Sequence, residues 1–273
     1  MFFRGVGHRR FRLLLVPGLL SGLSWTTPLF AQGGPPLLTT DPVTPGAQNL
    51  EINLGLMPIL RNDTKLVQLP QIDINYGVGQ DIQLTFYAPF EWQTANGQPN
   101  ATGWSNVFTG VKWHFLDHGE NGFNISMFPQ IEVRGSHASS RTGIADRGTR
   151  LELPFEFSKK VGPLDLNLEC GYYIPLVAHK THNERFIGLA FGHDFTKKLE
   201  GIGEIYNDWV LGAPPKDTFF DTGFRYTIHP SLILLFMAGR SFSPNSSGQP
   251  EFLAYAGFQI LLDKNGRSLH HEK

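Results

Sequence analysis

The chain has 273 residues, of which 23 are Lys or Arg and 24 are Asp or Glu, so its formal net charge is −1. This balance argues against a nucleic-acid partner, and a mean hydropathy of −0.17 argues against a helical membrane protein. The 22 phenylalanines and a hydrophobic fraction of 41% exclude a disordered chain, while the single cysteine, Cys170, excludes an intramolecular disulfide framework and a multi-cysteine zinc site.

The first 31 residues have the layout of a secretory signal peptide. Residues 1–12 carry four arginines and no acidic residue, and an apolar run follows at residues 13–20. Small residues come next, and Ala31-Gln32 is a suitable cleavage point. The alternative is a short anchor helix, which Pro17 and the shortness of the apolar run disfavour. We therefore predict an exported chain, and no later apolar run is long enough for a transmembrane helix.

From residue 49 onwards, apolar and polar residues alternate with period two. In the segment 81–92 every even position is apolar and the odd positions are mostly polar, as in a strand with one apolar and one polar face. Alternating segments of about ten residues, separated by turn residues, are the pattern of a transmembrane β-barrel. We predict twelve strands, at residues 49–60, 65–76, 81–92, 104–115, 123–134, 149–158, 164–175, 185–195, 199–207, 218–228, 231–241 and 252–262.

The connections between these strands alternate between short and long. Outer-membrane barrels have short periplasmic turns and longer extracellular loops. The short connections are 77–80, 117–122, 159–163, 196–198 and 229–230, and the longer ones are 93–103, 135–148, 176–184, 208–217 and 242–251. The regular spacing favours a barrel over a soluble β-sandwich. A count of ten or fourteen strands is also possible, because the alternation is weakest in segment 199–207.

We therefore predict an all-β fold, a transmembrane antiparallel up-and-down β-barrel of about 12 strands. The signal peptide is expected at 1–31, a periplasmic N-terminal extension at 32–48, the barrel at 49–262 and a C-terminal tail at 263–273. The predicted location is the outer membrane of a Gram-negative envelope. Outer-membrane lipid, lipopolysaccharide and the barrel-assembly machinery are the expected partners.

If the apolar positions face lipid, the alternate positions face the lumen. Both signs of charge occur there, and the candidate residues are Asp73, Lys112, Glu132, Arg134, Arg150, Glu152, Glu156, Asp165, Glu169, Glu204, Asp221 and Arg225. One hypothesis is a salt-bridge network that fills a narrow lumen. The other is a polar pathway with a local preference for cations.

A symmetric hairpin around 159–163 would pair Glu156 with Asp165 and Glu152 with Glu169. This arrangement stacks four carboxylates on one wall. Like charges directly opposite each other are destabilising, so these groups would need counter-ions. The candidate counter-ions are Arg134 and Arg150, which flank the long loop 135–148 in the preceding hairpin.

No catalytic, cofactor or metal site is predicted. A lipid-acting enzyme would need a serine nucleophile beside a histidine base. Ser126 is expected to point inward with no histidine level with it, while His193 and Asp194 point to opposite faces of one strand. The ten histidines show no metal-ligand spacing. We therefore expect a protein that is not an enzyme.

Four short motifs give the sequence a family resemblance. They are Gly34–Pro42 followed by Gln48–Asn53, the segment Leu69–Gly79, the segment Thr109–Leu116, and Gly201–Tyr206. The chain resembles the outer-membrane channel proteins, often labelled transporters, of the phenol meta-pathway degradation family. It departs from them at Thr40, where an Asp is usual, and at Leu50, where an aromatic is usual.

The resemblance implies an outer-membrane barrel that passes small solutes, including aromatic or hydrophobic compounds. Our first functional hypothesis is a passive channel or transporter for a small-molecule solute. The alternatives are a closed structural or surface-recognition barrel and, with less support, the lipid-acting enzyme.

Overall fold

The computed structural model describes residues 34–118, 122–145, 148–176, 182–212, 218–242 and 250–267, so the predicted signal peptide lies outside the described residues. The strands are β1 Leu50–Leu60, β2 Thr64–Val78, β3 Ile82–Ala95, β4 Ala101–Trp104, β5 Val107–Asp117, β6 Phe123–Met127, β7 Gln130–Val133, β8 Arg150–Val161, β9 Leu164–Pro175, β10 Glu184–Asp194, β11 Leu199–Val210, β12 Phe219–His229, β13 Leu232–Ser241 and β14 Phe252–Leu262. One short helix, α1, covers His137–Arg141.

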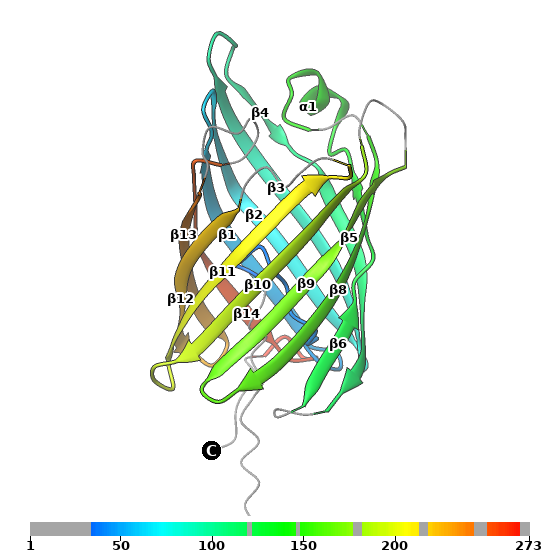
Figure 1. Ribbon diagram of the computed structural model, residues 1–273, viewed down its shortest axis with the longest axis vertical. Helices are drawn as coiled ribbons and strands as arrows, with labels where there is room; N and C mark the ends of the chain where they lie inside the picture. Colours follow the sequence, from blue (N-terminus) through cyan, green and yellow to red (C-terminus); the bar gives the residue numbers. More distant parts are fainter. Residues whose placement is uncertain are drawn as a thin grey trace, which may run out of the picture.

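These fourteen segments build twelve barrel strands (Figure 1). β4 and β5 are one strand interrupted at Ser105-Asn106, because both pair with β3. β6 and β7 are likewise one strand interrupted at Phe128-Pro129, because both pair with β5 and β8. β1 pairs with β14 in antiparallel fashion and closes the ring. The predicted closed antiparallel barrel of about 12 strands is confirmed.

The two faces of the strands differ as the alternation predicts. On β3, the outward Phe86 is 46% exposed, whereas its neighbour Thr85 is buried. One sector departs from the pattern, because β13 is apolar on both faces. Its inward residues Ile233, Leu235 and Met237 are buried in an apolar cluster inside the barrel. The lumen therefore has an apolar sector as well as a polar one.

The hairpin of β8 and β9 has a different register from the predicted one. Val161 pairs with Leu164, so only Gly162 and Pro163 form the turn. Gly162 has a positive φ of 62°, which suits the first central position of a two-residue hairpin turn. β8 therefore runs three residues further toward the turn than the predicted strand 149–158, whereas β9 begins at Leu164 as predicted.

The new register changes the predicted carboxylate pairs. Glu156 lies opposite Glu169, Glu152 lies opposite Tyr173, and Asp165 lies opposite Lys160. The predicted pairs of Glu156 with Asp165 and of Glu152 with Glu169 are wrong, as is the stack of four carboxylates.

The long connection after β7 folds over one mouth of the barrel, where Figure 1 shows α1 above the rim. Ser136 caps α1 by accepting a hydrogen bond from the backbone N–H of Ser139. Ile144 and Ala145 are buried behind the helix, and Ser105 donates to the carbonyl of Ile144 at 3.0 Å. Within the described ranges, no helix is both long and apolar enough to cross a membrane.

The start of the C-terminal tail forms a turn beyond β14. The carboxylate of Asp263 accepts hydrogen bonds from the backbone N–H groups of Arg267 and Asn265, each at 2.8 Å. These bonds, the one from Arg267 first, hold the pKa of Asp263 below its ordinary value.

On the inward face of β1, one glycine is in close contact with an aromatic side chain of β14, and this packing can be tested. Tyr255 of β14 lies over Gly55, where an added Cβ would be 2.4 Å from the tyrosine ring. Replacing Gly55 with Ala should therefore lower the free energy of unfolding by about 1–3 kcal/mol, through overpacking. Urea unfolding in lipid vesicles, followed by tryptophan fluorescence, measures the change. In a Tyr255→Leu background the same replacement should cost much less, and an equal cost in both backgrounds would contradict this packing.

Candidate functional site

The N-terminal segment occupies the barrel interior. We predict a periplasmic N-terminal extension at residues 32–48, but its described part, residues 34–48, enters the lumen, where the dark blue trace is seen within the ring of strands (Figure 1). Leu37 belongs to the buried apolar cluster with Met57 and Leu235, and Thr39 is 0% exposed. We call residues 34–48 the inner segment.

Three inward carboxylates bind the inner segment, two of them through its backbone. Glu204 on β11 accepts hydrogen bonds from the N–H groups of Leu38 and Thr39, both at 2.7 Å. Glu169 on β9 accepts from the N–H of Thr40 at 2.7 Å. The hydroxyl of Thr40 lies against both Glu169 and Glu156, and it donates to Glu156. The acids predicted to face the lumen therefore find their donors in a neighbouring segment of backbone.

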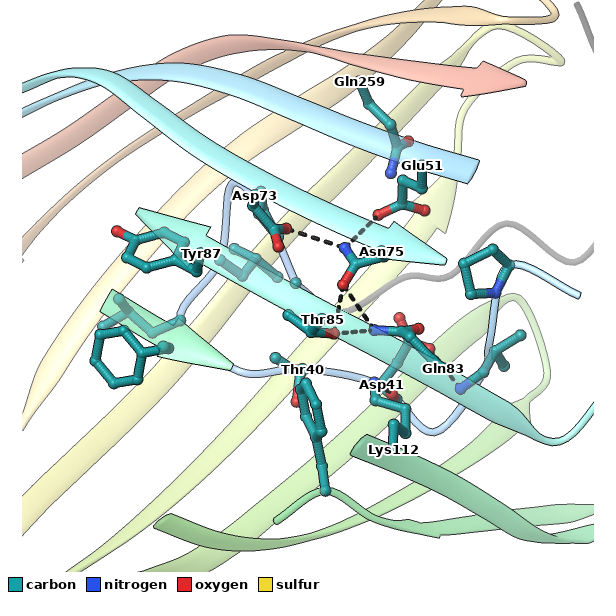
Figure 2. Close-up of a pocket in the computed structure, with 18 of the residues that line it drawn as sticks. Thr40, Asp41, Glu51, Asp73, Asn75, Gln83, Thr85, Tyr87, Lys112 and Gln259 are labelled. Atoms are coloured by element: carbon teal, nitrogen blue, oxygen red, sulfur yellow. Dashed lines mark hydrogen bonds between the residues drawn. The ribbon is translucent and has the colours of Figure 1, made fainter. Parts of the chain in front are cut away.

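Two inward cations bind carbonyl groups of the same segment. Lys112 on β5 donates to the carbonyl of Asp41, beside which it lies in Figure 2, and forms an ion pair with Glu156 at 3.2 Å. Arg225 on β12 donates to the carbonyls of Gly34 and Pro35 at 3.3 and 3.4 Å. Arg225 also pairs with Glu200 at 3.5 Å. Both signs of lumen charge thus fix the inner segment.

The inner segment turns back toward the rim that carries the short turns. The Thr44 hydroxyl donates to the carbonyl of Gln80 at 2.6 Å, and the N–H of Gln48 donates to the carbonyl of Gly77 at 2.8 Å. Gly77 is needed here, because a Cβ would lie 1.8 Å from the carbonyl oxygen of Gly46. The segment therefore reaches the middle of the lumen and returns before β1 begins.

A second group of predicted lumen residues lies nearer the long loops. Nε and Nη2 of Arg150 both lie 2.5 Å from one oxygen, Oε2, of Glu132, and Asn106 donates to the other oxygen of the same carboxylate. Arg150 also lies 3.9 Å from Glu184 and stacks over the ring of Tyr173. This group is a salt-bridge network of the kind the first lumen hypothesis describes.

Glu152 and Asp221 are also buried within the barrel. Asp221 lies directly opposite Glu204 in the pairing of β11 with β12. Glu152 lies beside Glu169 on the wall of a lumen cavity.

Two predicted lumen residues do not join these groups. Arg134 follows the end of β7, and its guanidinium lies 3.1 Å from the ring of exposed His137. Asp165 lies one residue into β9, near the hairpin turn, and pairs with Lys160 at 3.3 Å. The prediction that Arg134 serves as a counter-ion for the carboxylate wall is wrong, because the strand ends before it.

Two cavities lie around the inner segment. One, of about 580 Å³, reaches the short-turn rim at Asn49 and Pro230. The other, of about 540 Å³, reaches the long-loop rim at Arg61 and Gly143. We call them the short-turn cavity and the long-loop cavity.

Both cavities share a boundary made mostly of apolar side chains. Leu38 of the inner segment, Met57 on β1, Tyr87 on β3 and Phe108 on β5 line both of them. Tyr87 and Phe108 pack edge to face with their centroids 5.5 Å apart. We call these four residues the constriction.

The cavities differ in charge. Among the described residues, the short-turn cavity is lined by one basic residue, Lys112, and by five acidic residues, Asp41, Glu51, Asp73, Glu152 and Glu169. The described residues that line the long-loop cavity include two of each sign, Arg61, Arg150, Glu91 and Glu132. In the described part of the chain, the surplus of carboxylates therefore lies in the short-turn cavity.

Sequence reasoning missed several residues that shape these cavities. Glu51 occupies an inward position but was not among the predicted lumen residues, and Tyr87 and Phe108 were assigned no role. The strand alternation already contained the signal for Glu51, because it shares a face with Asn53. The role of Thr40 had no such signal, because it depends on a segment outside the alternating pattern.

The candidate enzymatic residues do not form a site. Ser126 is buried and donates to Glu156 on the inward face, whereas His193 lies outside beside Phe195 and contacts the carbonyl of Pro163 at 2.9 Å. In the part of the chain that the structure describes, no group of three His, Cys, Asp or Glu is arranged to hold a metal ion.

Comparison with known proteins identifies the class of fold. No family model and no curated protein sequence matches the chain. Among solved structures, the COG4313 outer membrane channel from Pseudomonas putida F1 is similar with a TM-score of 0.62 at 10% identity, over 84% of this chain and 99% of that one. The translocator domain of the autotransporter NalP from Neisseria meningitidis gives a TM-score of 0.51 at 13% identity, over 78% and 89% of the two chains.

The KdgM porin is similar with a TM-score of 0.50 at 9% identity, over 77% of this chain and 98% of the porin. At such identities the likeness is one of fold. The chain has the β-barrel fold of outer-membrane proteins.

The hold of Glu204 on the inner segment can be tested by thiol labelling. Replacing Glu204 with Gln removes a charged acceptor of two backbone N–H groups, and a hydrogen bond to a charged group contributes about 1.5–3 kcal/mol. In a Cys170→Ser background, a cysteine placed at buried Pro42 should then react with maleimide at least about tenfold faster. Asp165→Asn is the control, because Asp165 contacts Lys160 and not the segment. Equal labelling rates in all three proteins would contradict the assignment.

Proposed function

We propose that this protein is an outer-membrane channel through which small solutes diffuse passively, including aromatic or hydrophobic compounds. The observation that carries the proposal is the pair of cavities, one reaching each rim and both bounded by the constriction. The fold similarity to the COG4313 outer membrane channel and to the KdgM porin supports it. The short motifs shared with the phenol meta-pathway degradation family support aromatic solutes.

The outer surface supports placement in the outer membrane. Large apolar side chains such as Leu84, Val111 and Leu189 are exposed on strands far apart in the sequence. A soluble monomer rarely exposes so much apolar surface, whereas a lipid-facing barrel requires it. The predicted signal peptide would deliver the chain to this location.

The chemistry of the constriction favours apolar solutes over ions. Leu38, Met57 and Phe108 offer no side chain that could replace the water around an ion. A hydrated ion would lose hydrogen bonds there at a high cost, whereas an aromatic solute would lose none. The Tyr87 hydroxyl is itself engaged, since Gln71 donates to it at 2.6 Å.

The alternative is a closed barrel with a structural or surface-recognition role. The inner segment favours the closed barrel, because it occupies the middle of the lumen and is held there by hydrogen bonds to Glu204, Glu169 and Lys112. The two functions differ in whether a solute can pass the constriction while these bonds are intact.

Planar-bilayer recordings of the refolded mature chain separate the two functions. Phe108→Ala should raise the single-channel conductance by about twofold, because it removes an aromatic ring from the constriction. Phe115→Ala is the matched control, because Phe115 is exposed on the outer face of the same strand. If wild type and both variants are folded, as shown by gel mobility, but carry no current and release no entrapped aromatic dye from vesicles, the closed barrel is correct.

A further inference from the structure

The wall of the short-turn cavity contains two acidic residues with no basic partner. Glu51 and Asn53 lie on β1, and opposite them on β2 lie Asn75 and Asp73. The amide of Asn53 donates to Glu51 and to Asp73, each at 2.9 Å. The amide of Asn75 donates to the same two carboxylates at 3.4 and 3.1 Å. We call these four residues the acidic patch.

The orientation of Asn75 is fixed from the next strand. Its carbonyl oxygen accepts hydrogen bonds from Gln83 at 2.8 Å and from Thr85 at 2.6 Å, as Figure 2 shows. The amide group must therefore face Glu51 and Asp73. The two neutral amides thus hold the carboxylates of Glu51 and Asp73 close together without neutralising their negative charge.

None of the ion pairs among the described residues includes Glu51 or Asp73. The lumen cations are taken elsewhere: Lys112 by Glu156, Arg150 by Glu132 and Arg225 by Glu200. A buried carboxylate without a cationic partner is costly. A cationic ligand would remove that cost.

A second feature at the same wall points to a ligand. Tyr255 on β14 lines the cavity and is only 1% exposed, yet its hydroxyl makes no hydrogen bond. The ring lies over Gly55, the next inward residue of β1 after Glu51 and Asn53. A Cβ added at Gly55 would lie 2.5 Å from the hydroxyl oxygen of Tyr255. The free hydroxyl therefore adjoins the acidic patch.

Another part of the cavity wall is apolar, and the cavity is large. Leu37 and Pro36 of the inner segment line it, as do the rings of Phe128, Phe186 and Tyr206. A volume of about 580 Å³ is in the usual range for a small-molecule site. A metal ion would fit less well, because one oxygen of each patch carboxylate already accepts two amide bonds.

We propose that the short-turn cavity binds a small organic ammonium ion with an aromatic or other apolar body. The ammonium group donates hydrogen bonds to Glu51, Asp73 and the Tyr255 oxygen, and the body packs against the aromatic rings and the inner segment. The site lies on the short-turn side of the constriction, so binding does not require the ammonium ion to pass the constriction, and the inference goes beyond the proposed function.

Equilibrium binding to the folded protein in detergent micelles tests this inference without requiring conduction. Benzylammonium is the probe, and benzyl alcohol and benzoate are its uncharged and anionic counterparts. Calorimetry should show saturable binding of benzylammonium that is at least about tenfold tighter than binding of either counterpart. Equal binding of benzyl alcohol would overturn the proposal, since recognition would then be apolar only.

Variants locate the site. Glu51→Gln combined with Asp73→Asn should weaken benzylammonium binding by about tenfold or more, and Tyr255→Phe by a smaller factor. Asp63→Asn is the control for charge, because Asp63 is exposed in the turn between β1 and β2. Glu51→Gln alone is included because Glu51 is only partly buried, so this variant keeps the test valid if the double variant fails to fold. An unchanged affinity in folded patch variants would overturn the assignment.

Two further results separate this inference from the proposed function. Binding without any conductance and without release of entrapped aromatic dye would remove the channel and leave the ammonium site. Conductance without benzylammonium binding would leave the channel and overturn the site. Tighter binding of Mg²⁺ than of benzylammonium, lost in the patch variants, would show an inorganic cation site and also overturn the proposal.

Discussion

The interior of this barrel depends on hydrogen bonds between inward carboxylates and the backbone of the inner segment. A closed barrel satisfies its own strand backbone but leaves its inward side chains to find partners within the lumen. Glu204 and Glu169 are buried and have no basic residue in ion-pair contact among the described residues. The N–H groups of Leu38, Thr39 and Thr40 supply the donors that arginines and lysines do not. The chain thus solves an electrostatic problem with its own N-terminal backbone.

This solution also divides the lumen. Where the inner segment lies, Glu156, Glu169 and Glu204 accept hydrogen bonds from it and the space is filled. Beyond it, Arg150 and Glu132 neutralise each other directly, so the long-loop cavity is balanced in charge. On the side of β1 and β2 no such partner exists, and Glu51 and Asp73 share amide donors instead. The asymmetry between the cavities therefore follows from which wall the segment covers.

The strands could be predicted from the sequence because lipid and lumen impose period two on every one of them. The predicted twelve strands match the barrel, and Glu132, Glu156, Glu169, Glu204 and Arg225 are buried inside it. The β8–β9 register could not be predicted by symmetry, because it depends on the backbone of Gly162 at the turn. Arg134 was misplaced because alternation does not show where a strand ends.

The position of residues 34–48 inside the lumen could not be predicted from a local sequence pattern, for a different reason. A segment without periodicity looks the same in sequence whether it lies outside the barrel or inside it, and only the lumen decides. A signal did exist in the charge balance, since the predicted lumen residues included more acids than bases and those acids needed donors. The constriction depends on the same position of the inner segment. Leu38 is one of its four residues, and Glu204 accepts a hydrogen bond from the backbone N–H of Leu38. Selectivity for an apolar body and attraction for a cationic head would then arise from one fold: the inner segment supplies the apolar barrier, and the wall it leaves uncovered supplies the charge.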